Sequence, residues 1–378
     1  MRGSTAGLAD TLATDRHARA RSLLLKFADE VFGSAVVAPA VVTYWRGTWS
    51  LMDFYVLPKQ PVNSGIAALV FGLSVNFFLC VFQTQLSKHI RPDKGRFTYY
   101  VLSRLYTYVA ALACVGVWRG VRNLLDACTE GSATIVIYVT AAATLSLAAL
   151  RSLRNISAAP FAVLIDAPKD FFNVPTLFRT SNQKTALYIL DCLFSVTVIG
   201  SLVVVVWGGL WGVIDIYLYP DDPVKSCWMS LIVGYSMVFL TFSLQAPMQW
   251  VVARLQGAPR LLIADVYFFL SFASTVNVWR AIWGFLDIYF LPDSPLLSNW
   301  SCHIVSLALL ILLNCSNSIL VRGVYIDAEE PAGECVIFSC HYLRLFFQKK
   351  RTKRHKALDL TKKMEEASVP LQTPEEKL

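Results

Sequence analysis

The sequence predicts an all-α membrane protein of eight transmembrane helices. We expect four parallel two-helix repeats, which form two four-helix halves, with both termini in the cytoplasm. Three observations lead to this prediction. The 378-residue chain is 55% hydrophobic and only 16% charged, far more apolar than a soluble domain of this size. It contains apolar stretches long enough to cross a bilayer, and an aromatic block returns four times along it.

Each candidate span has close to the roughly 20 residues that a helix needs to cross the hydrocarbon core. The spans cover residues 31–49, 62–82, 98–117, 133–150, 186–208, 227–244, 261–278 and 302–320. No short apolar run followed by a small-residue cleavage site precedes the first span. We therefore expect that span to act as an uncleaved signal anchor.

Loop charges determine the predicted orientation. Loops after even-numbered spans are basic, with Lys88, Arg91, Lys94 and Arg96, then Arg151, Arg154, Lys169, Arg179 and Lys184, and then Arg254 and Arg260. Loops after odd-numbered spans carry Glu130, Asp221, Asp222 and Asp293. Because basic loops stay in the cytoplasm, the prediction is a cytoplasmic segment 1–26, a first half 27–160, a cytoplasmic linker 161–184, a second half 185–325 and a cytoplasmic basic tail 326–378.

The repeated block has tryptophan first, arginine second and aspartate ninth. These positions hold Trp45, Arg46 and Asp53; Trp118, Arg119 and Asp126; Trp207, Gly208 and Asp215; and Trp279, Arg280 and Asp287. The tryptophan, the residue four later and the aspartate share one face of a helix. The first and third blocks start 162 residues apart, and the second and fourth start 161 apart. This spacing indicates a unit that was duplicated twice.

An arginine stays charged, so within a membrane it needs a carboxylate, a lipid headgroup or water. Arginine and aspartate of one block are separated by about 10.5 Å of helix rise, so we expect each arginine to pair with the aspartate of a neighbouring unit. Three interpretations of the blocks stay open. They lock the helices together, they line an anion or substrate pathway, or they form a docking face for another membrane protein.

No catalytic or cofactor motif is present: there is no HExxH, P-loop, GxSxG or dinucleotide fingerprint. The nine cysteines form no CxxC pair or Cys/His metal spacing. We therefore expect a protein that is not an enzyme and has no cofactor or metal. The net charge of +8 lies in cytoplasmic loops and the tail. The run Lys349–Lys356 fits anionic lipid headgroups or a simply solvated surface, and no nucleic-acid partner is predicted.

With eight spans, inward termini and blocks such as that from Trp279 to Pro292, the chain resembles the fuseless family of invertebrate eight-pass membrane proteins. The resemblance covers about residues 27–325. It implies a presynaptic plasma-membrane protein that localises voltage-gated calcium channels at active zones and supports evoked vesicle exocytosis. It implies calcium channels or active-zone proteins as partners and supplies no catalytic residue. An ion channel or small-solute transporter is the alternative, and the second block departs from the pattern with Arg122 where the others have tryptophan.

Overall fold

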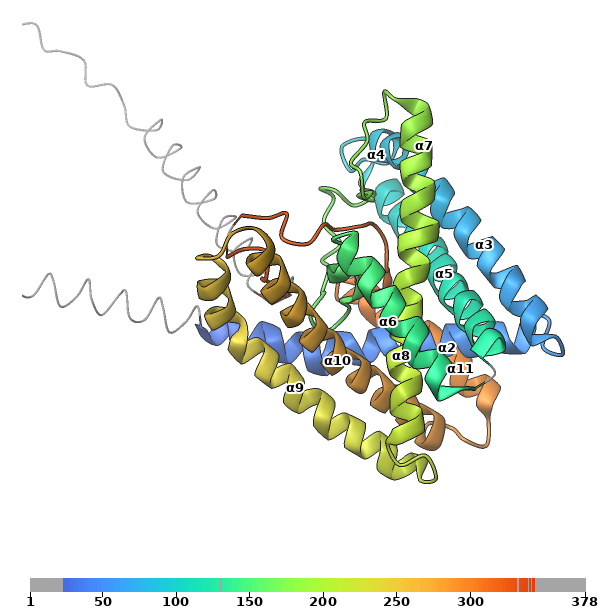
Figure 1. The fold of residues 1–378 in the computed structure, drawn as a ribbon. Helices are drawn as coiled ribbons and strands as arrows, with labels where there is room; N and C mark the ends of the chain where they lie inside the picture. The colour runs from blue at the N-terminus through green and yellow to red at the C-terminus, as the bar shows by residue number, and fades with distance from the viewer. Residues whose placement is uncertain (1–22, 130, 332, 339, 341, 344–378) are drawn as a thin grey trace, which may run out of the picture. The chain divides into compact units, whose positions relative to one another are not determined.

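The computed structural model describes residues 23–129, 131–331, 333–338, 340 and 342–343 (Figure 1). Contacts divide the chain into two units, residues 32–340 and residues 1–31 with 341–378. In the smaller unit, Lys26 lies 3.8 Å from Glu30 four residues later, and the backbone N–H of Leu343 donates to the Asp29 carboxylate. The predicted lipid-binding run Lys349–Lys356 lies outside the described residues.

The larger unit contains all four blocks, and its regular secondary structure is helical throughout the described residues. Its α-helices are α2 (Ala38–Tyr55), α3 (Pro61–Val81), α4 (Gln83–His89), α5 (Arg96–Thr129), α6 (Ala133–Ala149), α7 (Thr185–Phe194), α8 (Gly200–Tyr217), α9 (Pro223–Val252), α10 (Gly257–Tyr289) and α11 (Pro295–Leu312). Shorter helical turns are η1 (Gly33–Val37), η2 (Leu153–Ile156), η3 (Ser195–Ile199), which joins α7 to α8, and η4 (Ser316–Ile319).

Six described helical stretches are long and apolar enough to cross a membrane. They are Pro61–Val81, Arg96–Thr129, Thr185–Tyr217, Pro223–Val252, Gly257–Tyr289 and Pro295–Leu312. Helix α6 is apolar but shorter, at 17 residues. Helix α2 has 18 residues and includes Arg46 and Asp53, which lower its mean hydropathy. All eight predicted spans overlap a helix, and six of these helices meet the length and composition expected of a span.

Several helices differ in their ends from the predicted spans: α2, α5, α8, α9 and α10 continue past them, and α11 is shifted toward the N-terminus. The span predicted over 98–117 belongs to α5, which continues to Thr129, because backbone hydrogen bonds continue where the apolar run stops at Arg119. The span predicted over 302–320 is α11, which starts earlier at Pro295 and ends at Leu312. The polar run that begins at Asn314 follows, and Asn314 has a positive φ of 56°, which a helix interior does not allow.

Three block helices end in the same backbone conformation. The residue before the block proline has a positive φ in each case, 46° at Leu57, 50° at Tyr219 and 52° at Leu291. A left-handed residue stops a helix, and a proline cannot continue it. The following helices α3, α9 and α11 then begin with a proline in their first turn. Each of these three blocks therefore ends in a short turn that reverses the chain.

The four block helices form a closed ring. Helix α2 contacts α5, α5 contacts α8, α8 contacts α10, and α10 contacts α2. Each block helix packs most extensively with an outer helix that does not follow it along the chain. The outer helix α3 packs against α5, α6 against α8, α9 against α10, and α11 against α2 (Figure 1). Thus each outer helix packs on the block helix that follows it in the chain, and the last outer helix, α11, packs on the first block helix, α2.

Small residues at the third block position allow this close packing. The position holds Gly47, Gly120, Gly209 and Ala281. A Cβ atom at Gly47 would lie 2.7 Å from the backbone oxygen of Asn299 on α11, and one at Gly120 would lie 2.7 Å from the backbone oxygen of Gly65 on α3. Backbone cannot move aside as a side chain can. These glycines therefore set the separation of each block helix from its outer partner.

We predict that Gly120→Val destabilises the protein by about 3 kcal/mol or more, because overpacking a tight contact typically costs 1–3 kcal/mol and here the obstacle is backbone. Thermal melting of the detergent-purified protein, followed by size-exclusion chromatography, measures the effect. Gly95→Ala is the matched control, since a Cβ there meets nothing closer than 3.6 Å. Equal melting temperatures for both variants would contradict the prediction.

Candidate functional site

The first tryptophans of the four blocks form a closed aromatic ring. Trp45 contacts Trp118 with ring centroids 5.1 Å apart, Trp118 contacts Trp207 at 5.3 Å, Trp207 contacts Trp279 at 5.3 Å, and Trp279 returns to Trp45 at 5.7 Å. Every pair is edge-to-face, an arrangement that the indole quadrupole favours. The rings meet where the four block helices face one another. The four tryptophans therefore fill the space between the block helices at this level. We call this packed contact between the four block helices the seam.

A second aromatic layer lies one helical turn further along the blocks. Trp283 contacts Trp49 at 5.9 Å and Trp211 at 5.8 Å, again edge-to-face. The fourth member of this layer is Arg122, where the second block lacks a tryptophan. The tryptophans of this layer are half-buried, and they extend the aromatic packing by one helical turn.

Three arginines of the blocks pair with aspartates of neighbouring blocks, as the helix geometry predicted. The guanidinium is buried in each pair, while the carboxylate side chain is about half exposed. The pairs are Arg46 with Asp287 at 2.9 Å, Arg119 with Asp53 at 2.7 Å, and Arg280 with Asp215 at 2.7 Å. Each pair links the block helices of two successive units, and Arg46 with Asp287 links the first to the last.

Three serines that were not predicted as site residues complete these ion pairs. Ser64, Ser226 and Ser298 each receive a hydrogen bond from the paired arginine, at 2.7, 2.7 and 2.8 Å. Each serine hydroxyl also donates to a backbone carbonyl at the end of the preceding block helix. The signal was present, because each serine stands 19 residues after the block tryptophan. The corresponding residue after Trp118 is Ile137.

The two departures from the block pattern compensate for each other. Arg122 of the second block pairs with Asp126, with Nε 2.9 Å from the carboxylate oxygen. Its guanidinium also donates to the backbone oxygen of Gly208 at 2.7 Å. A Cβ atom at Gly208 would lie only 3.3 Å from Arg122. Thus Arg122 provides, from inside the second block, the cation that the third block lacks, and the glycine leaves space for it.

On the other side of the aromatic ring, two loop segments close the seam. The indole N–H of Trp45 donates to the carbonyl of Ile319, that of Trp207 to Ile156 and that of Trp279 to Ala159. The acceptors belong to η4, to η2 and to the chain just after η2. Within the segment predicted as the linker 161–184 and in the described chain after α11, several apolar side chains are buried, namely Phe161, Phe171, Phe172, Val174, Cys335 and Val336.

The two segments hold each other by reciprocal caps. Asp166, which follows η2, accepts hydrogen bonds from backbone N–H groups of η4, and Asp327, which follows η4, accepts from those of η2. The donors are Ser316 and Asn317 for Asp166, and Leu153 and Arg154 for Asp327. Burial raises the pKa of Asp327, and the two backbone amides oppose that rise. Asp166 also pairs with Arg104 at 2.7 Å, which brings α5 to the same junction.

The part of the chain that carries this architecture matches a known protein family. The model of the Fuseless family matches residues 24–320, a range that contains all four blocks and the three serines. The chain belongs to the Fuseless family. No curated protein and no solved structure gives a significant match.

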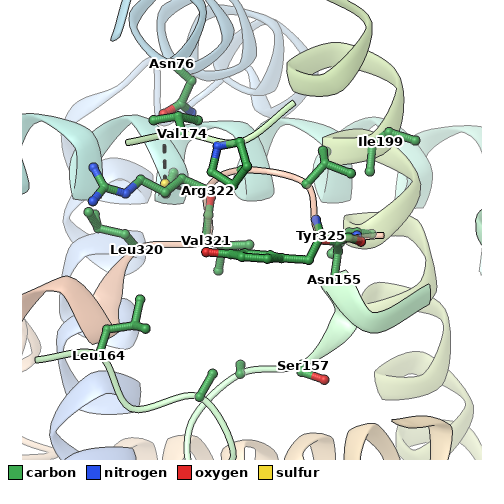
Figure 2. Close-up of a pocket in the computed structure, with 18 of the residues that line it drawn as sticks. Asn76, Asn155, Ser157, Leu164, Val174, Ile199, Leu320, Val321, Arg322 and Tyr325 are labelled. Carbon is green, nitrogen blue, oxygen red and sulfur yellow. Dashed lines mark hydrogen bonds between the residues drawn. The ribbon is translucent and has the colours of Figure 1, made fainter. Parts of the chain in front are cut away.

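In this Fuseless-family chain, a cavity of about 230 Å³ lies on the loop side of the aromatic ring. Trp118 and Trp279 line it, together with residues from α3, α5, η3 and α8 and from both loop segments. Figure 2 shows Asn76 on one side of the space, Ser157 and Leu164 on the other, and the ring of Tyr325 reaching across it.

The site residues predicted from the blocks therefore come together as one seam. Their roles beyond packing and pairing stay a prediction. Among the described residues, no group of three or more His, Cys, Asp or Glu side chains lies where it could hold a metal ion. The cavity was not predicted, because part of its lining comes from loops whose apolar residues follow no regular period.

We predict that Arg280→Asp strongly destabilises the protein and that adding Asp215→Arg restores much of the loss. Removing one partner of a buried pair costs about 3–5 kcal/mol, and the half-exposed carboxylate places this pair toward the lower end. The double-mutant cycle, measured by thermal melting in detergent, isolates the pairing. Arg91→Asp is the control, since the Arg91 side chain is 55% exposed and such pairs contribute little. Lack of rescue would show that Arg280 acts through other contacts.

A second cycle tests the compensation at the second block. Gly208→Arg alone crowds Arg122, and Arg122→Trp alone leaves Asp126 without its cation. The double variant recreates the pattern of the other blocks, and Ile137→Ser supplies the missing hydroxyl. We expect the combined variants to be at least about 1 kcal/mol more stable than the sum of the single effects, as measured by melting temperature. Simple additivity would refute the compensation.

Proposed function

We propose that this Fuseless-family protein is a non-enzymatic scaffold of the presynaptic plasma membrane that organises active zones. In this proposal it localises voltage-gated calcium channels and thereby supports evoked vesicle exocytosis. It crosses the membrane eight times as four parallel two-helix repeats, with both termini in the cytoplasm. In this proposal α2 and α6 also cross the membrane, packed against longer helices. Pairing of polar groups inside the bundle offsets the cost of placing those groups in the bilayer.

The observation that carries the scaffold proposal is the filled seam. The four tryptophans close the space between the block helices, and the arginines that could attract an anion are each paired with a carboxylate. A permeation pathway needs a site weak enough to release the ion, and a buried guanidinium that already binds a carboxylate and a serine hydroxyl is not such a site. A rigid ring with lipid-facing outer helices instead offers a fixed surface in the membrane to other proteins.

Co-purification tests the proposal directly. The full chain, tagged and expressed in neurons at native level, is expected to recover a voltage-gated calcium channel subunit or an active-zone protein after mild detergent extraction. An unrelated multi-pass protein of the same membrane, expressed to the same level, is the control. Repeated recovery of neither class, with proximity labelling also negative, would overturn the scaffold proposal.

The alternative, an ion channel or small-solute transporter, is distinguished by flux. Purified protein in liposomes is expected to show no ion or solute flux above that of empty liposomes across a broad panel. Flux that disappears with Arg280→Lys, at unchanged melting temperature, would replace the scaffold by the transport function.

A further inference from the structure

We propose that the cavity beneath the aromatic ring binds a neutral, hydroxyl-bearing lipid, of the sterol or diacylglycerol class. This inference does not depend on the scaffold function. It begins with Trp118, the member of the tryptophan ring whose indole N–H makes no hydrogen bond within the described chain. The other three donate to loop carbonyls. Trp118 instead lines the cavity.

Other polar groups on the cavity wall are similarly unused. The Asn76 side chain has only a weak contact from the Cys114 thiol, at 4.0 Å. In Figure 2 the Tyr325 ring lies across the cavity and carries its hydroxyl into the space. Buried polar groups are normally hydrogen-bonded, so this set of groups fits a ligand with a polar head.

The lining indicates a ligand without charge. Among the described residues that form the wall, none is Asp or Glu. Both arginines of the wall are engaged elsewhere: Arg154 pairs with Glu330, and Arg322 donates to the Tyr106 hydroxyl and the Phe171 carbonyl. Figure 2 shows the Arg322 guanidinium directed away from the space. The groups available to a ligand are therefore neutral.

Size and access indicate a lipid. At about 230 Å³ the cavity is larger than a 150 Å³ apolar cavity that takes up benzene. Most of the wall is apolar, from residues such as Val117, Ile199 and Val203. Tyr325 and Leu164 line the cavity and are 44% and 36% exposed, so the cavity reaches the surface beside them. A hydroxyl head group and its first carbons fit inside, and the rest of the lipid extends outward.

Photo-crosslinking with the purified full chain in lipid nanodiscs tests the site. The probes are a clickable photoreactive cholesterol and a clickable photoreactive diacylglycerol, and a phosphatidylserine probe serves as the charged comparison. We expect one neutral probe to label peptides from the cavity wall at least tenfold above the phosphatidylserine probe. The probe that labels identifies the class, and excess unlabelled lipid of that class should compete.

Two kinds of variant link labelling to the cavity. Ala110→Phe fills the space from α5, where Ala110 is buried, and should abolish labelling. Ala142→Phe, at an exposed position of α6, should not. Tyr325→Phe removes a hydroxyl that has no partner in the described chain, so it should leave the melting temperature unchanged. It should lower labelling about three- to tenfold, the net worth of one hydrogen bond, and Tyr217→Phe is its control.

The proposal is overturned if neither neutral probe labels the wall, or if labelling persists at wild-type level in Ala110→Phe. Unchanged labelling in Tyr325→Phe would equally reject the polar contacts on which the proposal rests. Preferential labelling by phosphatidylserine would assign the cavity to an anionic lipid instead.

Discussion

A buried arginine must find a partner, and this requirement organises the ring of block helices. An isolated guanidinium in a low-dielectric bundle costs too much to persist, whereas one that pairs with a carboxylate and a serine hydroxyl is tolerated. Because the arginine and aspartate of a block are too far apart along one helix, the pairing has to join successive helices. Arg46 with Asp287 closes the circle between the first block and the last. The tryptophan ring fills the space that this closure leaves.

The two sides of the tryptophan ring differ in how densely they are packed. The block side is dense, with two aromatic layers and charged groups in pairs. The loop side is held by carboxylate caps and is hollow next to Trp118. The indole N–H groups of Trp45, Trp207 and Trp279 donate to loop carbonyls, whereas that of Trp118 has no partner among the described residues. The loss of one hydrogen bond to a loop carbonyl thus leaves a polar N–H group on a residue of the cavity wall.

Much of the seam could be predicted from the sequence, because helix geometry is regular. The stripe of Trp45, Trp49 and Asp53 and the need for a partner in another unit both follow from the rise per residue. The identity of that partner did not follow, since it depends on which helices are neighbours. The compensation between Arg122 and Gly208 was also hidden, because each change by itself looks like a loss of symmetry.

The loop segments were harder to predict for a different reason. Phe161 and Phe171 lie among prolines and polar residues, without the period of a helix or strand, so their burial leaves no pattern in the sequence. The ends of α5 and α11 were misplaced because hydropathy measures apolar character, whereas a helix ends where its hydrogen bonds stop. Ser64, Ser226 and Ser298 could have been found from their constant spacing alone.

The offset packing of the outer helices has a consequence for the origin of the chain. Helix α6 closes the first half yet packs on α8 of the second, and α11 closes the second half yet packs on α2 of the first. Asp166 and Asp327 cross over in the same way. This exchange is what two copies of a single half would make around a two-fold axis. A homodimer of half-length chains could already have formed the same ring, and gene fusion would then have joined the copies without a new interface.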